Sequence, residues 1–144
     1  MPIGDIKDMN KYNLDFHHIG LAVSSPDKAL EFLRGLGYTS EEIILDEIQN
    51  VQLVLCSHPE MPNIEIIFRT KTRGPVDFIL KDKSELMYHI CYETESLEKT
   101  LKAFKKDGLS IRTLSKPKPA KLFQNHNISF YHVSGIGVIE LLEK

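Results

Sequence analysis

The chain has 144 residues, of which 42% are apolar and 26% are charged, and its formal net charge is −2. This length and composition suit one globular domain, residues 1–144, that can bury a core without disulfide bonds. No apolar run approaches the ~18 residues that a membrane-spanning helix needs, so we expect no such helix and no membrane partner.

The first half of the chain has the pattern of a strand, a helix and three more strands. Apolar residues predict a strand at Phe16–Val23, and the Ser-Pro-Asp motif at 25–27 is typical of a helix start. The helix should end near Gly35, with Gly37 as its stop signal. Polar segments separate three further predicted strands, at Tyr38–Asp46, Val51–Cys56 and Asn63–Phe68.

The same order of elements recurs after a predicted linker at about residues 70–85. A strand is expected at Leu86–Glu93, and a helix at Leu97–Lys106 with Ser96 as its N-terminal cap. Lys116–Pro119 is expected to be a loop because of its prolines. The remaining strands are predicted at Ser110–Leu114, Asn127–Val133 and Val138–Leu142.

These two halves, about residues 16–69 and 86–143, predict one module written twice. A helix of ~10 residues covers only one face of a small sheet, so each module needs a partner for its other face. We therefore expect an α+β fold of two tandem βαβββ modules that pair edge to edge. Their strands would form a curved, mostly antiparallel eight-stranded sheet, with helices outside and a concave inner face that suits a ligand pocket.

Charge is distributed unevenly along the chain. Residues 1–70 contain 5 Lys+Arg and 11 Asp+Glu, whereas residues 71–144 contain 13 and 9. The late basic residues could attract a phosphorylated or carboxylated small ligand, or they could form an ordinary solvated surface. No nucleic-acid-binding motif accompanies them, so we expect no nucleic-acid partner.

The N-terminus and the cysteines indicate a cellular compartment. Residues 1–15 are polar and acidic, without the basic head and apolar stretch of a signal peptide. Cys56 and Cys91 lie singly in apolar strands, which favours buried free thiols in a reducing environment over a disulfide framework. We therefore expect a cytoplasmic protein.

Two histidines and two glutamates occupy matching places in the two halves. His18 and His89 lie in the first strand of each module, and Glu65 and Glu140 lie in the middle of apolar strands. A buried carboxylate costs several kcal/mol unless a cation, a proton or a strong donor compensates it. Two imidazoles and two carboxylates suit a divalent ion such as Co, Ni, Mn, Zn or Fe, so we predict a metal site. Whether one chain supplies all four ligands or two chains share them stays open.

Strand alternation decides which neighbours should join this site. It predicts that each glutamate faces the cavity, while Ile64, Ile66, Ile139 and Leu141 pack under the helices. By the same rule His17 should point to the face opposite to His18 and stay outside the site.

The stretches His18–Val23, Tyr88–Glu93 and Gly137–Glu143 resemble the vicinal oxygen chelate superfamily, which includes glyoxalases, bleomycin resistance proteins and dioxygenases. The match is closest to methylmalonyl-CoA epimerase-like proteins. The resemblance implies that the superfamily's four metal ligands map onto His18, Glu65, His89 and Glu140. The resemblance implies that a divalent ion stabilises an enolate beside a carbonyl or thioester. It further implies that Glu140 moves the proton with a second acid opposite. The strand expected to hold that acid has none, and the nearest carboxylate is Glu47.

The resemblance leaves several functions open. The first is a metal-dependent isomerase or epimerase that acts on an acyl-CoA or related thioester. The second is a lactoylglutathione lyase with a glutathione thioester product, and the third is a binding protein of the same fold without turnover. Related folds frequently pair, so we expect a homodimer.

Overall fold

The structure, a computed structural model, describes residues 9–144; residues 1–8, part of the expected domain, lie outside the described residues. Helices and strands alternate much as the two-module pattern predicts. In chain order the elements are β1 (Asp15–Val23), α2 (Asp27–Gly35), β2 (Thr39–Ser40), β3 (Ile44–Asp46), β4 (Val51–Ser57), β5 (Ile64–Arg69), α3 (Pro75–Leu80), β6 (Glu85–Thr94), α4 (Leu97–Lys106), β7 (Ile111–Ala120), the 3-10 turn η1 (Lys121–Phe123), β8 (His126–Val133) and β9 (Gly137–Glu143).

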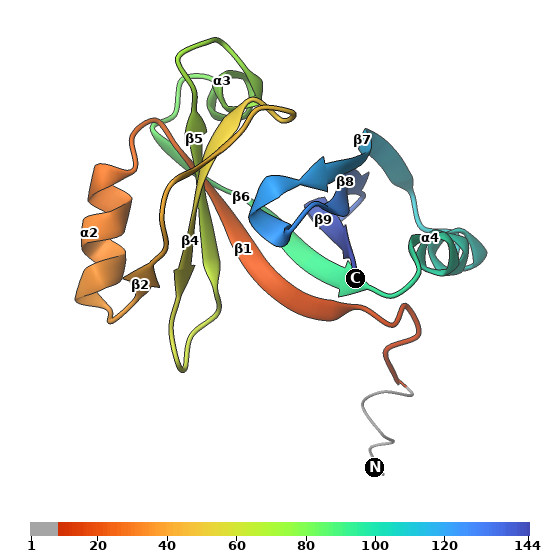
Figure 1. The fold of residues 1–144 in the computed structure, drawn as a ribbon. Coiled ribbons are helices and arrows are strands. Elements are labelled where there is room, and N and C mark those ends of the chain that lie inside the picture. Colours follow the sequence, from red (N-terminus) through yellow and green to blue (C-terminus); the bar gives the residue numbers. More distant parts are fainter. Residues whose placement is uncertain (1–8) are drawn as a thin grey trace.

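The strands form one sheet in the order β2-β4-β5-β1-β6-β9-β8-β7, with β3 also paired to β4. At its centre β1 and β6, the first strands of the two halves, run antiparallel side by side (Figure 1). β1 pairs in parallel with β5, and β6 pairs in parallel with β9. The predicted α+β fold with two modules joined edge to edge is therefore confirmed.

The sheet has nine strands rather than eight because the predicted strand at Tyr38–Asp46 is split into β2 and β3. Along this segment the chain advances four residues from Ser40 to Ile44, whereas β4 advances three from Cys56 to Leu53. Regular pairing cannot continue across that mismatch.

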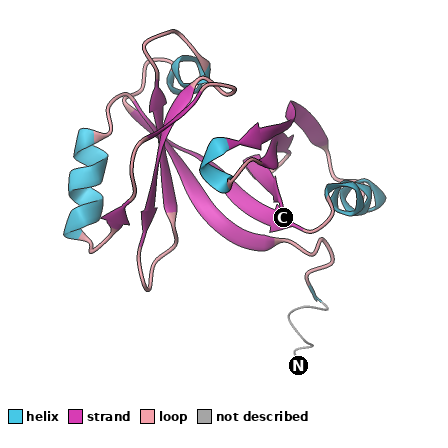
Figure 2. Ribbon diagram, in the orientation of Figure 1, coloured by secondary structure: helices cyan, strands magenta, loops and turns pink. Residues whose placement is uncertain are grey.

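Helices α2 and α4 cover the outer face of the sheet, as the pattern predicts (Figure 2). In the first half, Ile64 and Ile66 pack with Leu33 of α2. In the second half, Ile139 and Leu141 pack with Phe104 of α4. Each fully buried side chain of this size contributes ~1.5–3 kcal/mol, so these layers fix which face of each strand points inward.

Helix α3 lies in the segment predicted to be a linker, and it packs on the inner face rather than outside. Pro75 is its first residue, and the Asp77 side chain accepts a hydrogen bond from the Gly74 backbone N–H at 2.8 Å. Val76 and Leu80 are buried against inner residues of β4 and β5. The two helices that the pattern predicts, α2 and α4, lie outside as expected, whereas α3 is an additional short helix whose six residues are held by tertiary packing.

Lys116–Pro119, predicted to be a loop, belongs to β7 instead. β7 is an edge strand whose only neighbour is β8, and its pairing shifts register between Thr113 and Lys118. An edge strand tolerates proline because one side of it needs no ladder partner.

The predicted cap of α4 is confirmed, since the Ser96 side chain accepts a hydrogen bond from the Lys99 backbone N–H at 3.3 Å. Cys56 and Cys91 are buried free thiols, as predicted. Within residues 9–144, no helix combines the length and the apolar character needed to span a bilayer.

Candidate metal centre

The four predicted ligands meet on the inner face of the sheet. His18 comes from β1, Glu65 from β5, His89 from β6 and Glu140 from β9. One nitrogen or oxygen atom from each residue lies within 4.8 Å of the others, and no member is more than 4% exposed. All four side chains of this cluster belong to one chain.

Strand register explains how residues so far apart in sequence converge. Residues opposite each other on paired strands project from the same face. The cluster therefore occupies matched positions on the four central strands. The relevant pairs are Gly20 with His89 and His18 with Cys91 between β1 and β6, Gly20 with Glu65 between β1 and β5, and Cys91 with Glu140 between β6 and β9.

The distances in the cluster are too short for four independent core residues. Oε1 of Glu140 lies 3.1 Å from Nε2 of His18 and 3.0 Å from Nε2 of His89. The two Nε2 atoms are 3.3 Å apart. Even so, Oε1 of Glu140 is buried and accepts no well-angled hydrogen bond from the described residues. Buried polar atoms without a partner are rare, and a shared divalent cation would satisfy this one. The donor set and its orphaned oxygen thus fit a metal ion.

Without a metal, protons stabilise the cluster. Burial raises the pKa of Glu65 to about 7, and the charge of Glu140 acts in the same direction. Burial also disfavours charge on Glu140, but attraction to His89 and His18 is stronger and lowers the pKa of Glu140. For His18, burial opposes protonation, yet the carboxylates of Glu65 and Glu140 raise its pKa. Because metal ligands must be deprotonated, a bound cation would take the place of these protons.

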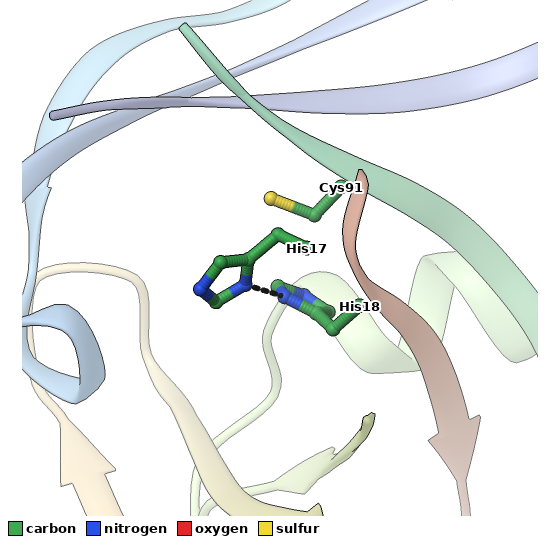
Figure 3. Close-up of side chains that lie close together, drawn as sticks. All are labelled: His17, His18 and Cys91. Atoms are coloured by element: carbon green, nitrogen blue, oxygen red, sulfur yellow. Dashed lines mark hydrogen bonds between the residues drawn. The ribbon is translucent and has the colours of Figure 1, made fainter. Parts of the chain in front are cut away.

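His17 lies next to His18, so the prediction that it points to the opposite face is wrong. The β1–β6 register shifts between Phe16 and His18, which makes His17 the extra residue of a β-bulge. Alternation fails at such a point. Figure 3 shows the two imidazoles side by side and joined by a hydrogen bond, with the Cys91 thiol nearby. Nδ1 of His17 lies 2.8 Å from Nδ1 of His18.

Two further neighbours of the histidine ligands were not predicted. The Phe123 ring of η1 stacks on His18, with centroids 5.4 Å apart and planes 24° apart. The ring of His89 packs directly on Gly20, and a β-carbon added at Gly20 would overlap three atoms of that imidazole. The His18-Ile19-Gly20 motif was a possible signal for Gly20, whereas Phe123 has none in the local sequence.

A cavity of about 300 Å³ opens onto the two glutamates of the cluster. Its walls are mainly apolar and come from both halves, including Leu53 of β4 and Phe130 of β8. Burial, together with the charge of Glu140, raises the pKa of Tyr88 to about 12, so this hydroxyl stays protonated. The polar lining residues apart from the glutamates are Gln49, Tyr88, Ser115 and Lys118.

Glu47 does not reach this cavity. It is exposed and borders a separate surface groove with Asn50 and Thr70. The cavity side of β4 is formed instead by Val51 and Leu53, which are apolar. The structure therefore does not bring Glu47 to the cluster, and Glu47 does not enter our proposal.

Comparisons with known proteins agree with this geometry. The family model described as the Glyoxalase/Bleomycin resistance protein/Dioxygenase superfamily matches residues 17–131. The chain has no significant match among curated proteins.

Solved structures share the fold at low sequence identity. Methylmalonyl-CoA epimerase from Mycobacterium tuberculosis is 18% identical with a TM-score of 0.72, covering 90% of this chain and 87% of that chain. A hypothetical protein from Bacillus halodurans is 22% identical with a TM-score of 0.76, covering 91% and 94%. A methylmalonyl-CoA epimerase in complex with methylmalonyl-CoA and NH4+ is 20% identical with a TM-score of 0.69, covering 91% and 94%.

Proposed function

Because the chain belongs to the glyoxalase/bleomycin resistance protein/dioxygenase superfamily, we propose that it is a metal-dependent isomerase or epimerase acting beside a carbonyl or thioester. Family membership also confirms the resemblance found in the sequence. We propose an acyl-CoA thioester as the substrate class, which the fold shared with methylmalonyl-CoA epimerases supports.

One observation carries the proposal: His18, Glu65, His89 and Glu140 converge where an apolar-walled cavity ends. These four residues would hold the ion. A bound divalent cation would supply electrostatic stabilisation, worth several kcal/mol, to the negative charge that develops on a substrate carbonyl oxygen.

Residues of the chain supply the remaining chemistry. Glu140 faces the cavity, and the lowered pKa of its carboxyl keeps it ionised, as a proton acceptor requires. Glu65 is the only other carboxylate among the described lining residues and comes from the opposite module. We assign proton exchange with the substrate to Glu140 and metal binding alone to Glu65, since a carboxylate that binds the ion carries no proton to give. The apolar walls limit the access of water to the reacting carbon.

Lys118 would attract the anionic part of the substrate. Among the basic residues between Lys99 and Lys121, it alone lines the cavity as described. An exposed cation at a cavity wall favours a phosphorylated or carboxylated ligand through long-range attraction.

Deuterium exchange tests this function directly. Metal-loaded protein in heavy water should introduce deuterium at the α-carbon of methylmalonyl-CoA, measured by mass spectrometry. Glu140→Gln should abolish the exchange, whereas Glu143→Gln, on the same strand but outside the cluster, should retain it. No exchange with metal-loaded wild-type protein would remove methylmalonyl-CoA as a substrate.

A lactoylglutathione lyase is a second candidate, favoured by the apolar cavity side of β4. Moving a proton between adjacent carbons of a hemithioacetal needs no acid on that strand, because one base, here Glu140, can remove the proton from one carbon and return it to the next. A spectrophotometric assay with methylglyoxal and glutathione distinguishes this activity from epimerisation. Metal binding without turnover in either assay would favour a binding protein of the same fold.

A further inference from the structure

The bulge in β1 gives His18 a polar partner on the side away from the cluster. Nε2 of His18 faces the glutamates, at 3.1 Å from Glu140, while its Nδ1 lies 2.8 Å from Nδ1 of His17 (Figure 3). The ring of His17 is held in turn by Phe123, edge to face, with centroids 5.1 Å apart. His17 is therefore a fixed neighbour rather than a free surface side chain.

The proton positions follow from this contact. A histidine that binds a metal through Nε2 must carry its ring proton on Nδ1. In His18 that Nδ1–H then donates to Nδ1 of His17, which must be the acceptor and carry its own proton on Nε2. Such outer partners of metal-bound imidazoles set both the tautomer and the orientation of the ring.

We propose that His17 is a positioning residue that holds His18 in the tautomer and ring orientation required for metal binding. This inference rests on the proposed metal centre. It adds to that centre a residue that is not among the residues lining the cavity and that approaches the cluster through His18.

In the second module, the corresponding imidazole has no such hydrogen bond within the described part of the chain. Tyr88 occupies the matching place, immediately before His89 and at the other register shift of the β1–β6 pair. Its ring lies edge to face against His89 at 4.9 Å, but Nδ1 of His89 has no hydrogen-bond partner among the described residues. Packing against Gly20 and Tyr88 thus holds one imidazole, whereas a hydrogen bond to His17 holds the other.

Metal affinity is the quantity that tests the proposal. His17→Phe keeps an aromatic ring but removes the acceptor. We expect it to raise the dissociation constant for Co2+ or Zn2+ by ~10–100-fold, measured in competition with a chelator. His17→Asn should restore most of the affinity because its amide oxygen can accept at nearly the same place. His132→Phe, at a histidine outside the cluster, is the matched control and should bind as wild type does.

Two further measurements separate positioning from a general loss of structure. In the Zn2+-loaded wild type, the Nδ1–H of His18 should give an exchange-protected proton resonance that His17→Phe lacks and His17→Asn retains. If His17→Phe does not fold, the isosteric pair His17→Leu and His17→Asn gives the same comparison. Melting temperatures of the metal-free variants identify any loss of folding.

The outcomes that overturn the proposal are distinct from failure of the proposed function. If wild type binds no divalent metal, the metal centre itself is wrong. If wild type binds metal and folded His17→Phe binds it equally well, only the inference is wrong. A third outcome involves Cys91, whose thiol lies near both histidines. A sulfur-to-Co2+ charge-transfer band that Cys91→Ser removes would place the ion among those three residues and overturn the positioning role.

Discussion

His89 lies over Gly20, its partner across the β1–β6 pair, and the imidazole occupies the space where a β-carbon would project from Gly20. The absence of a side chain at Gly20 thus makes room for a candidate metal ligand, His89, on the neighbouring strand. Here glycine is required by close approach rather than by an unusual backbone conformation.

We expect Gly20→Ala to displace His89 and to weaken metal binding by at least an order of magnitude, ~1.4 kcal/mol or more. The reason is that His89 cannot keep its position without overlapping the new methyl group. Chelator competition measures the affinity. Gly35→Ala is the matched control because nothing lies within 4 Å of that position. It should leave binding unchanged and stabilise α2 by ~0.5–1 kcal/mol. Wild-type affinity in Gly20→Ala would contradict the role of this contact.

Glu140→Ala should release the ion from purified protein. The change removes the carboxylate that approaches both imidazoles most closely, at 3.0 and 3.1 Å. Elemental analysis of the variant beside wild type gives the metal content per chain. Glu143→Ala, three residues further along β9, should keep its metal. Equal metal content in all three proteins would show that Glu140 is not a ligand.

The stabilisation that metal gives should grow as pH rises from 4.5 to about 7, because the metal-free fold loses stability over that range. Glu65 has a folded pKa of about 7 against 4.5 as its ordinary value, so the metal-free fold loses stability as pH rises between these values. The raised pKa of His18 acts in the same direction, since its contribution is present below 6.5 and is lost as pH rises. The lowered pKa of Glu140 contributes stability that is present above pH 4.5 and is lost only as pH falls below that value.

Metal binding has the opposite pH dependence because it needs deprotonated ligands. The difference in melting temperature between metal-loaded and metal-free protein should therefore be larger at the higher pH. In Glu65→Gln the fall in metal-free stability between pH 4.5 and 7 should shrink, because the group with the raised pKa is gone. A metal-induced shift that falls with pH would contradict this linkage.

Asp46 joins the two modules at the edge of the cavity. Its carboxylate accepts hydrogen bonds from the Lys121 backbone N–H at 3.3 Å and from the Gln49 side chain at 2.7 Å. We expect Asp46→Ala to cost ~1–3 kcal/mol, because the Gln49 side chain and the Lys121 backbone N–H lose a buried, charged acceptor. Urea denaturation measures this cost, and amide hydrogen exchange at Lys121 should become faster. Asp82→Ala, at an exposed turn, should change stability by less than ~0.5 kcal/mol. Unchanged exchange at Lys121 would mean that Asp46 does not restrain η1.

Sequence patterns predicted most of the fold because they depend on short-range geometry. Alternation along β5 and β9 placed Ile64 and Ile139 under the helices and turned Glu65 and Glu140 inward, and the structure has that arrangement. The repeated positions of the histidines and glutamates in the two halves also pointed to the four side chains that the structure brings together.

Predictions failed where a residue's place depends on a distant partner. His17 is the extra residue of a bulge that forms in the pairing with β6, so alternation within β1 misplaced it. Pro117 and Pro119 lie in a strand because β7 is at the sheet edge, which its own sequence does not reveal. Glu47 was near the expected strand in sequence but lies outside the cavity.

The amino-acid sequence by itself was enough to predict the duplicated α+β modules and the types of the candidate ligands. The periodicities of helices and strands repeat within a few residues, so they can be read locally. Folding of the whole chain settled which imidazole gained His17 as a partner, which glycine makes room for His89, and which walls enclose the glutamates. These features depend on register between strands tens of residues apart, and register is a balance of packing over the entire sheet.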